Sequence, residues 1–314
     1  MAVVDSFYLL QKGISRSYLT HTEPLLLLGT FYAAKQALWF LRCAFGLARN
    51  VVRLLKPHHL PSQCGEWAVV CGIHDGGLGQ AYARELALRG FSVALIGKDQ
   101  HNLELVADMI EQSSKVKTLV VVTTGGPGCV DRCAIAHNFD EMDIGVFVWL
   151  LPPHKPMQPL TSRVQEMTAS VWRDTWWLLG SEPLIELVLP AMIERGRGGI
   201  VLVIPPNYLL SDDPRLSADT AFLECYSRGL RLGLAPLGLF VQLLTPLRLA
   251  SPITTLVGFR YAIDQPSLFT PTPETYAKYA VWTLGVLPCT AGYWPHSLQL
   301  MLSRWLPKCF RSIF

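Results

Sequence analysis

From residue 67 onward, short apolar runs alternate with segments in which apolar residues recur every three or four positions. The runs lie at 67–71, 92–96, 118–123, 144–151, 199–204 and 238–246. Those at 118–123 (TLVVVT) and 144–151 (IGVFVWLL) are uninterrupted, which is typical of strands whose two faces are both covered. We therefore expect these runs to be the strands of one parallel sheet.

Segments with helical periodicity fill the intervals between these runs. They span 78–90, 102–112, 168–195, 219–234 and 273–286. Gly90 is expected to cap the first helix, Pro183 to break the third, and Pro273 to lie in the first turn of the last. This alternation predicts an α/β fold: a Rossmann-like, doubly wound parallel sheet with helices on both faces.

Residues 1–56 differ from the rest and predict an N-terminal helical appendage that is both apolar and basic. A linker at 57–66 joins it to the domain at 67–314. Within the appendage, residues 24–55 fit three interpretations: a helix lying in a membrane interface, a tilted span whose cations reach the headgroups, or a helix packed on the domain. We favour association with a membrane surface.

The composition supports a large core and argues against nucleic-acid binding. Half of the 314 residues are hydrophobic and 16% are charged, and the formal net charge is only +3. The first 60 residues contain Lys12, Arg16, Lys35, Arg42, Arg49, Arg53 and Lys56, against Asp5 and Glu23. A local basic excess of this kind suits an anionic membrane surface better than a DNA groove.

The cysteines give no indication of a metal centre. None of the eight forms the paired CxxC spacing of a zinc site, and Cys129 and Cys133 are interpreted as two unrelated thiols. The start of the chain also lacks the pattern of a cleavable signal peptide, so we expect a reducing compartment.

The stretch CGIHDGGLG (71–79) lies where the first predicted strand leads into the first predicted helix. A glycine-rich turn at such a place lets the backbone approach a dinucleotide diphosphate at the helix N-terminus. The glycines concerned are Gly72, Gly76, Gly77 and Gly79. This turn alone is a weak signal, because the same glycines also permit a tight turn and close packing of helix on strand.

Longer stretches make the assignment more specific. WAVVCG followed by AYARELALRG, then LVLPAMIERGRGGIV and TLGVLPCTAGYWPHS, are similar to the short-chain dehydrogenase/reductase family over nearly the whole chain. The resemblance is to the branch of 17β-hydroxysteroid dehydrogenases and very-long-chain 3-oxoacyl-CoA reductases, and within it to a catalytically inactive member. It implies descent from enzymes that use a nicotinamide cofactor.

The resemblance also locates the family's catalytic groups, and none of them is present. The asparagine, serine, tyrosine and lysine positions fall on Leu178, Pro205, Leu216 and Thr220. None of these can exchange a proton in the family's roles, and loss of one acid/base group already lowers the rate by about 10²–10⁴. The chain is therefore expected to be a pseudoenzyme with no catalytic residue.

The resemblance leaves the cofactor question open. The family spacing Gly-x-x-x-Gly-x-Gly fits Gly72 and Gly76 but then meets Leu78, whereas Gly77 and Gly79 fit if the alignment starts from the helix. The loop therefore carries one extra residue.

Two further positions bear on the cofactor. Lys98 lies where a basic side chain favours the 2′-phosphate of NADP, but Thr124 replaces the aspartate that contacts adenine in the family. We favour a vestigial site without cofactor, with NADP as the alternative.

These expectations define a function: a non-catalytic scaffold or interaction module. One alternative is an NADP-dependent reductase of ketosteroids or 3-oxoacyl chains with displaced catalytic groups. Another is an apolar lipid or sterol binder, since the former active site carries Trp149, Leu150, Leu151, Trp176, Trp177, Leu178 and Leu216. The resemblance implies a mitochondrial location, with the endoplasmic reticulum membrane as alternative, and a homodimer formed by helices near the lost catalytic segment.

Overall fold

A computed structural model describes most of the domain and small parts of the appendage. The described residues are 64–73, 77–123, 139, 142–151, 182–206, 214–250 and 265–305, together with 6, 8, 11–12, 26–38 and 41. The chain divides into two compact units, Met1–Lys56 and Pro57–Phe314. In the first unit, residues 26–38 form a helix whose side chains are almost all exposed. Within the described part of the chain, no helix has both the length and the apolarity to cross a membrane.

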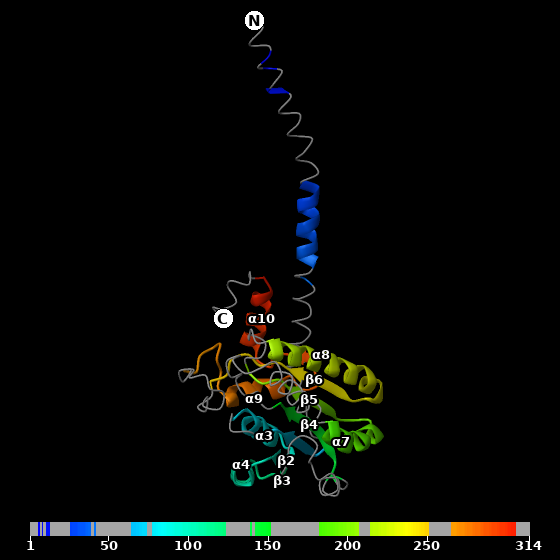
Figure 1. Cartoon of the computed structure of the whole chain (residues 1–314), viewed down its shortest axis with the longest axis vertical. Helices are drawn as coiled ribbons and strands as arrows, with labels where there is room; N and C mark the ends of the chain where they lie inside the picture. The colour runs from blue at the N-terminus through cyan, green and yellow to red at the C-terminus, as the bar shows by residue number, and fades with distance from the viewer. Residues whose placement is uncertain are drawn as a thin grey trace, which may run out of the picture. The chain divides into compact units, whose positions relative to one another are not determined.

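The centre of the second unit is a parallel sheet (Figure 1). Its described strands are β1 Trp67–Cys71, β2 Ser92–Gly97, β3 Thr118–Val122, β4 Ile144–Leu150, β5 Gly199–Val203, β6 Phe240–Leu244 and β7 Cys289–Thr290. They are ordered β3-β2-β1-β4-β5-β6-β7, and every neighbouring pair is parallel. The predicted parallel sheet is confirmed, and the chain order reverses between β1 and β4.

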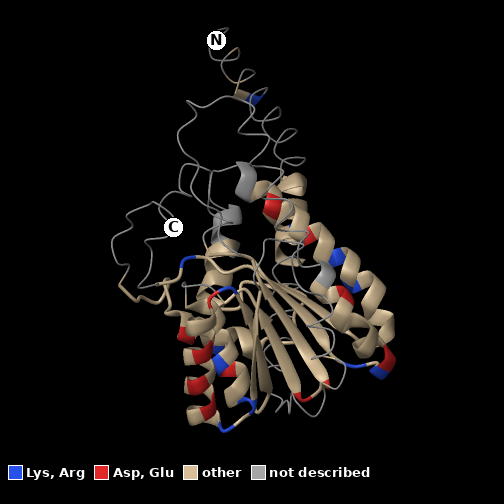
Figure 2. Ribbon diagram, turned by 60° about the horizontal axis from the view of Figure 1, so that its bottom comes forward, with Lys and Arg blue, Asp and Glu red and all other residues tan. Residues whose placement is uncertain are grey.

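Helices cover both faces of this sheet, and their outer sides carry most of the charged residues (Figure 2). They are α3 Leu78–Leu88, α4 Gln100–Ser114, α7 Glu182–Arg195, α8 Pro214–Leu234, α9 Pro273–Trp282 and α10 Trp294–Trp305, with a 3₁₀ turn η2 Ala235–Leu237. Residues of α3, α4 and α9 share one hydrophobic cluster, and residues of α7 and α8 share the other. The doubly wound arrangement is as predicted.

Several helix boundaries differ from the sequence prediction. The C-cap of α3 is Arg89, and Gly90 follows it with φ of +93°, in the left-handed region that glycine adopts without strain. Helix α8 begins at Pro214 rather than at 219, because proline is compatible with a first helical turn. Helix α9 ends at Trp282 instead of 286.

The break predicted near Pro183 is a helix start. Helix α7 begins at Glu182, so the ring of Pro183 removes an N–H that has no intrahelical partner in any case. The remainder of that predicted segment, 168–181, lies outside the described residues.

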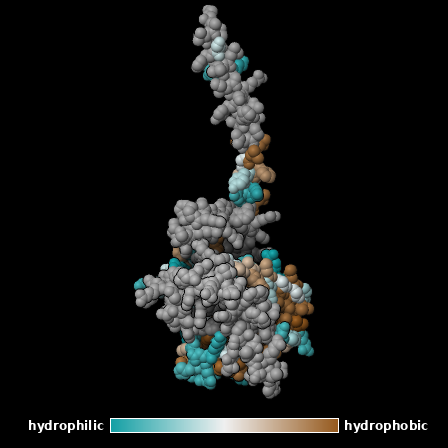
Figure 3. Space-filling model, in the orientation of Figure 1, coloured by the Kyte–Doolittle hydropathy of each residue, from teal (hydrophilic) through white to brown (hydrophobic). Residues whose placement is uncertain are grey.

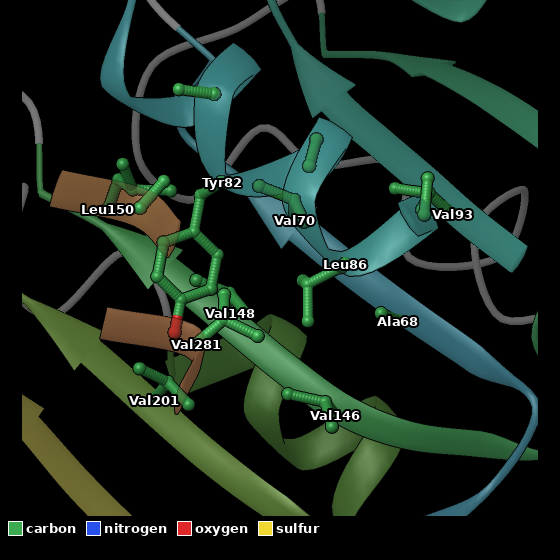
Figure 4. Packing of buried hydrophobic residues seen from close by; sticks show 14 of the residues in the cluster. Ala68, Val70, Tyr82, Leu86, Val93, Val146, Val148, Leu150, Val201 and Val281 are labelled. Carbon is green, nitrogen blue, oxygen red and sulfur yellow. The ribbon is translucent and has the colours of Figure 1, made fainter. Parts of the chain in front are cut away.

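Alternate residues of each strand enter opposite cores, as the period of two requires. Ala68 and Val70 of β1 pack under α3, whereas Val69 and Cys71 face α7 and α8. The aromatic ring of Tyr82 on α3 lies over this first core, with its hydroxyl directed toward α9 (Figure 4). All five side chains are at most 3% exposed, so the turn after β1 rests on a fully packed support.

Candidate functional site

The turn after β1 begins at Gly72, where a side chain has no room. The residue has φ of +89°, and a Cβ atom added there would approach the Leu150 carbonyl oxygen of β4 far inside van der Waals contact. Its N–H donates to the Ile96 carbonyl at 3.1 Å. Backbone conformation and close strand packing therefore both require glycine at this position, whether or not a cofactor binds.

The other end of the turn is the N-terminus of α3. Gly77 is its N-cap, with φ of +71°, and no side chain caps the helix. Gly79 is buried in the first turn, where an added Cβ would lie 3.2 Å from the Ile73 Cα. The structure thus places Gly77 and Gly79 at the start of α3. Gly76 lies outside the described residues.

The first turn of α3 retains one property of a phosphate site. The N–H groups there have no capping side chain, and no acidic residue lies in the first turn. Free helix N-terminal amides attract anions. The turn therefore keeps donors suited to a diphosphate, although close packing already explains Gly72 and Gly79, and the left-handed φ of Gly77 explains that glycine.

Lys98, the residue predicted to favour NADP, is exposed immediately after β2. The next residue, Asp99, is the N-cap of α4 and accepts hydrogen bonds from the backbone N–H groups of His101 and Asn102 at 3.1 and 3.4 Å. Asn102 in turn accepts from the Gln80 amide at 3.0 Å, which links α4 to α3 beside the turn. Thr124 lies outside the described residues.

The former catalytic positions carry no acid or base. Pro205 is buried just after β5, and Thr220 is 7% exposed on α8. Helix α8 spans both Leu216 and Thr220, so the tyrosine and lysine positions lie one turn apart as expected. Leu178 lies outside the described residues, as do Trp176 and Trp177.

The carboxyl end of β4 is filled by three large apolar side chains. Trp149 and Leu151 belong to the core under α7 and α8, and Leu150 belongs to the core under α3 and α9. Each is 5–7% exposed. The Leu151 N–H donates to the Val203 carbonyl at 3.1 Å, which extends the pairing of β4 with β5 by one residue. At these three positions the former active site is packed core.

The described domain also holds perturbed titratable groups that the sequence analysis did not single out as site candidates. Burial raises the pKa values of Tyr82 and Tyr276, two fully buried residues of α3 and α9. Burial lowers the pKa of His296, on α10, to about 4. Tyr82 also contributes electrostatically to the raised pKa of Tyr276, but burial is the largest cause for all three groups, and an oppositely charged partner of the kind found in a catalytic constellation contributes to none of these shifts.

The two buried thiols of the described domain, Cys64 and Cys71, are also poorly suited to chemistry. Burial raises the pKa of Cys64 to about 11, and it raises that of Cys71 further. Protonated thiols at neutral pH are weak nucleophiles and weak metal ligands. Among the described residues no three His, Cys, Asp or Glu side chains are close enough to hold a metal ion.

Comparison with known proteins gives the family. The inactive hydroxysteroid dehydrogenase-like protein 1 of Rattus norvegicus and that of Homo sapiens are each 34% identical to the chain over 319 aligned residues, which cover 98% of this chain and 93% of the relative. A very-long-chain 3-oxoacyl-CoA reductase of Anas platyrhynchos is 32% identical over 75% of this chain and 74% of its own length. No family model matches the chain.

Solved structures agree on the fold. A 7β-hydroxysteroid dehydrogenase structure matches 78% of the chain with a TM-score of 0.60 at 17% identity, and the match covers 93% of that structure. A short-chain dehydrogenase from Sphingobium yanoikuyae in complex with NADPH matches 77% with a TM-score of 0.57 at 19% identity, covering 96% of that structure.

The site and the relatives lead to one conclusion. Proline, leucine and threonine occupy the family's serine, tyrosine and lysine positions, and the full-length relatives bear the name inactive. The chain is a catalytically inactive, short-chain dehydrogenase-like protein. It belongs to the short-chain dehydrogenase/reductase family, in the branch of hydroxysteroid dehydrogenase-like proteins and very-long-chain 3-oxoacyl-CoA reductases.

Proposed function

We propose that this chain is a scaffold or interaction module that uses a dehydrogenase fold without its chemistry. The observation that carries the proposal is the burial of Pro205 and Thr220 at the serine and lysine positions. A residual enzyme would need a displaced acid or base near the ends of β4 and β5. The described end of β4 instead contributes the buried side chains of Trp149 and Leu151.

A turnover assay tests this proposal against its enzymatic alternative. The full chain is incubated with NADPH and either a ketosteroid or a 3-oxoacyl-CoA, and cofactor oxidation is followed at 340 nm. We expect no oxidation above the rate without protein. Turnover that disappears in Lys98→Ala would overturn the proposal, because it would establish NADP-dependent reduction.

We also propose that the glycine turn is now structural and that the chain does not depend on NADP. Gly72 and Gly79 are both explained by contacts with Leu150 and Ile73, without a ligand. Support for the alternative comes from exposed Lys98 and from the uncapped N-terminus of α3. Calorimetric titration of the full chain with NADPH and NADH decides between them. Heat of binding for NADPH that is lost in Lys98→Ala would assign NADP to this turn.

Finally, we propose that residues 24–55 attach the protein to a mitochondrial membrane, with the endoplasmic reticulum membrane as the alternative. The support is their apolar pattern and the basic excess of the first 60 residues. Cell fractionation of tagged full-length protein and of a version lacking residues 1–56 tests the assignment. Equal membrane recovery of both would show that this segment does not direct the protein.

A further inference from the structure

Helices α9 and α10 and the segment before α9 expose large aromatic and apolar side chains on the domain surface. They are Phe269, Tyr279, Trp282, Trp294 and Leu298, each between 38% and 56% exposed. We call these five residues the α9–α10 surface. Tryptophan and tyrosine are unusual in exposed positions of soluble domains, because each ring leaves a large apolar area in water.

Ring contacts join the two helices of this surface. The ring of Tyr279 on α9 meets that of Tyr293 edge to face at 5.2 Å, and Tyr293 lies 6.5 Å from the ring of Trp294 at the start of α10. Tyr293 is only 6% exposed. A buried aromatic side chain therefore holds two exposed ones in place, so that the rings are presented by a rigid support.

Phe269 is attached to the same support through its backbone. The Nδ1 atom of His296 accepts the Leu247 N–H at 3.4 Å, which leaves Nε2 to donate to the Phe269 carbonyl at 3.2 Å. His296 lies on α10 two residues after Trp294 and is fully buried. The described parts of the surface thus come from three chain segments that are tied together below it.

The sequence from this surface to the C-terminus is net basic. From residue 275 to the C-terminus the sequence contains no Asp or Glu, whereas it contains Lys278, Arg304, Lys308 and Arg311. Lys278 is exposed on α9, directly before Tyr279. Glu274, exposed in the first turn of α9, is the one acidic residue in the sequence from Phe269 to the C-terminus, so four basic residues against one acidic residue leave this segment a net charge of +3, which favours an anionic partner. Lys308 and Arg311 lie outside the described residues.

Helix α4 provides a contrast within the same domain. It also exposes two apolar side chains, Leu105 and Met109, but its sequence places Glu104, Asp108 and Glu111 among them. Acidic residues of this kind are suited to water and are repelled by anionic headgroups. By sequence, α9 carries Glu274 and Lys278 and α10 carries only Arg304, so exposed aromatic rings with few acidic residues distinguish these two helices from α4.

We infer that the α9–α10 surface docks onto an anionic phospholipid bilayer. The amphipathic rings of Trp and Tyr are stable at headgroup depth, where one edge is wet and the other apolar, and basic side chains pair with lipid phosphates. This inference deepens the proposed membrane association, on which it rests. It adds a second contact, in the folded domain, to the one proposed for residues 24–55.

Fluorescence quenching by lipids provides a local test. Full-length protein is mixed with vesicles of equal parts phosphatidylcholine and phosphatidylserine, with bromine atoms near the headgroup end of the acyl chains. Replacing both Trp282 and Trp294 by Phe keeps the apolar rings but removes two fluorophores. We expect the quenched part of the emission to fall while vesicle binding is retained, because two of the rings at headgroup depth no longer emit. Trp67→Phe, at the half-buried start of β1, is the matched control and should leave the quenched part unchanged. If the quenched part of the emission were as large in the double variant as in the wild type, the inference would be overturned.

Vesicle partitioning separates this inference from the proposed function. Trp294→Glu and Leu298→Glu together should weaken partitioning of the full chain roughly tenfold, because buried carboxylates oppose both apolar and electrostatic contact. Leu105→Glu on α4, equally exposed, should not. If the wild type partitions and the double variant partitions equally, the inference fails and attachment through residues 24–55 stands. If the wild type does not partition, the proposed membrane association fails as well. A change of mass in sedimentation without a change in partitioning would assign the surface to a second copy and overturn the inference.

Discussion

At the scale of single residues, the fully buried side chain of His296 makes hydrogen bonds to the backbone of two other chain segments. It receives a backbone N–H from one side and donates to a carbonyl on the other, which fixes the neutral tautomer with hydrogen on Nε2. Leu247 and Phe269, the two backbone partners, flank the segment 251–264 in sequence. The His296 imidazole therefore links the backbone before this segment to the backbone after it. Protonation of Nδ1 would remove the acceptor for the Leu247 N–H.

This geometry predicts a loss of stability in mild acid. The pKa of His296 is lowered by burial to about 4 in the fold, below the 6.5 of an exposed histidine, so the unfolded chain binds more protons between these values. The free energy of unfolding should fall by roughly 3 kcal/mol as the pH decreases from about 6.5 to about 4. Urea unfolding of the wild type and His296→Asn at pH 7 and pH 4.5 measures the difference. His101→Asn, at an exposed position of α4, is the control; an equal acid response in wild type and His296→Asn would contradict the assignment.

A second prediction concerns the two buried tyrosines. Among the described residues, neither the Tyr82 nor the Tyr276 hydroxyl has a hydrogen-bond partner, although both side chains are fully buried. A buried unpaired hydroxyl lowers stability by about 1–3 kcal/mol, so Tyr276→Phe should raise the free energy of unfolding by about 1 kcal/mol. Tyr279→Phe, whose ring is partly exposed, should leave it unchanged. Destabilisation by Tyr276→Phe in thermal unfolding would mean that its hydroxyl is satisfied.

At the scale of elements, the glycine turn and helix α8 give opposite expectations for the same substitution. Gly72→Ala would place a methyl group against the Leu150 carbonyl in a left-handed backbone conformation, which should lower the free energy of unfolding by more than about 3 kcal/mol. Gly229→Ala in α8 meets no atom within 4 Å and improves helix propensity, which should raise it by about 0.5–1 kcal/mol. Chemical denaturation of both variants checks the pair; a mild effect of Gly72→Ala would show that the turn can move away from β4.

The same elements show what periodicity can and cannot predict. The six strands predicted from apolar runs are present, because strands buried on both faces leave a strong local signal. Strand β7, of two residues, and helix α10 were not predicted. A two-residue strand has no measurable period, and it exists because Leu243 and Leu244 of β6 supply its partners. The start of α8 differs from the prediction for a related reason, since residues 214–218 carry no apolar stripe and periodicity therefore predicts a helix only from residue 219.

For the candidate site, the sequence predicts the missing catalytic residues better than it predicts the contacts of the glycine turn. The absence of a tyrosine, lysine or serine can be read from an aligned motif, and the described positions Pro205 and Thr220 agree with that reading. The reason for the glycines could not be read in this way. Gly72 is required by the Leu150 carbonyl, which comes from a strand 78 residues later in the chain, and no local pattern contains that contact.

At the scale of the whole molecule, the outer side of α8 exposes large apolar side chains beside the charged residues Glu224 and Arg228. Phe222 is 38% and Leu232 is 71% exposed on this helix, and the ring of Phe222 stacks on that of Tyr226 at 5.9 Å. Figure 3 shows hydrophobic side chains gathered over this part of the domain. Apolar area left on a helix face is typical of an interface, and we propose that a second copy of the chain covers it.

A two-fold pairing of α8 would make both protomers present the same residues to each other, so one substitution changes the interface twice. Phe222→Glu and Leu232→Glu should therefore convert a dimer to a monomer, because each protomer would bury a carboxylate against the same group of its partner. Sedimentation equilibrium of the full chain measures the mass directly. Leu105→Glu on α4 replaces another exposed leucine without touching α8, and the mass of this variant should equal that of the wild type. A wild-type monomer at tens of micromolar protein would contradict the pairing, and a dimer that survives both glutamate substitutions would place the interface on another face.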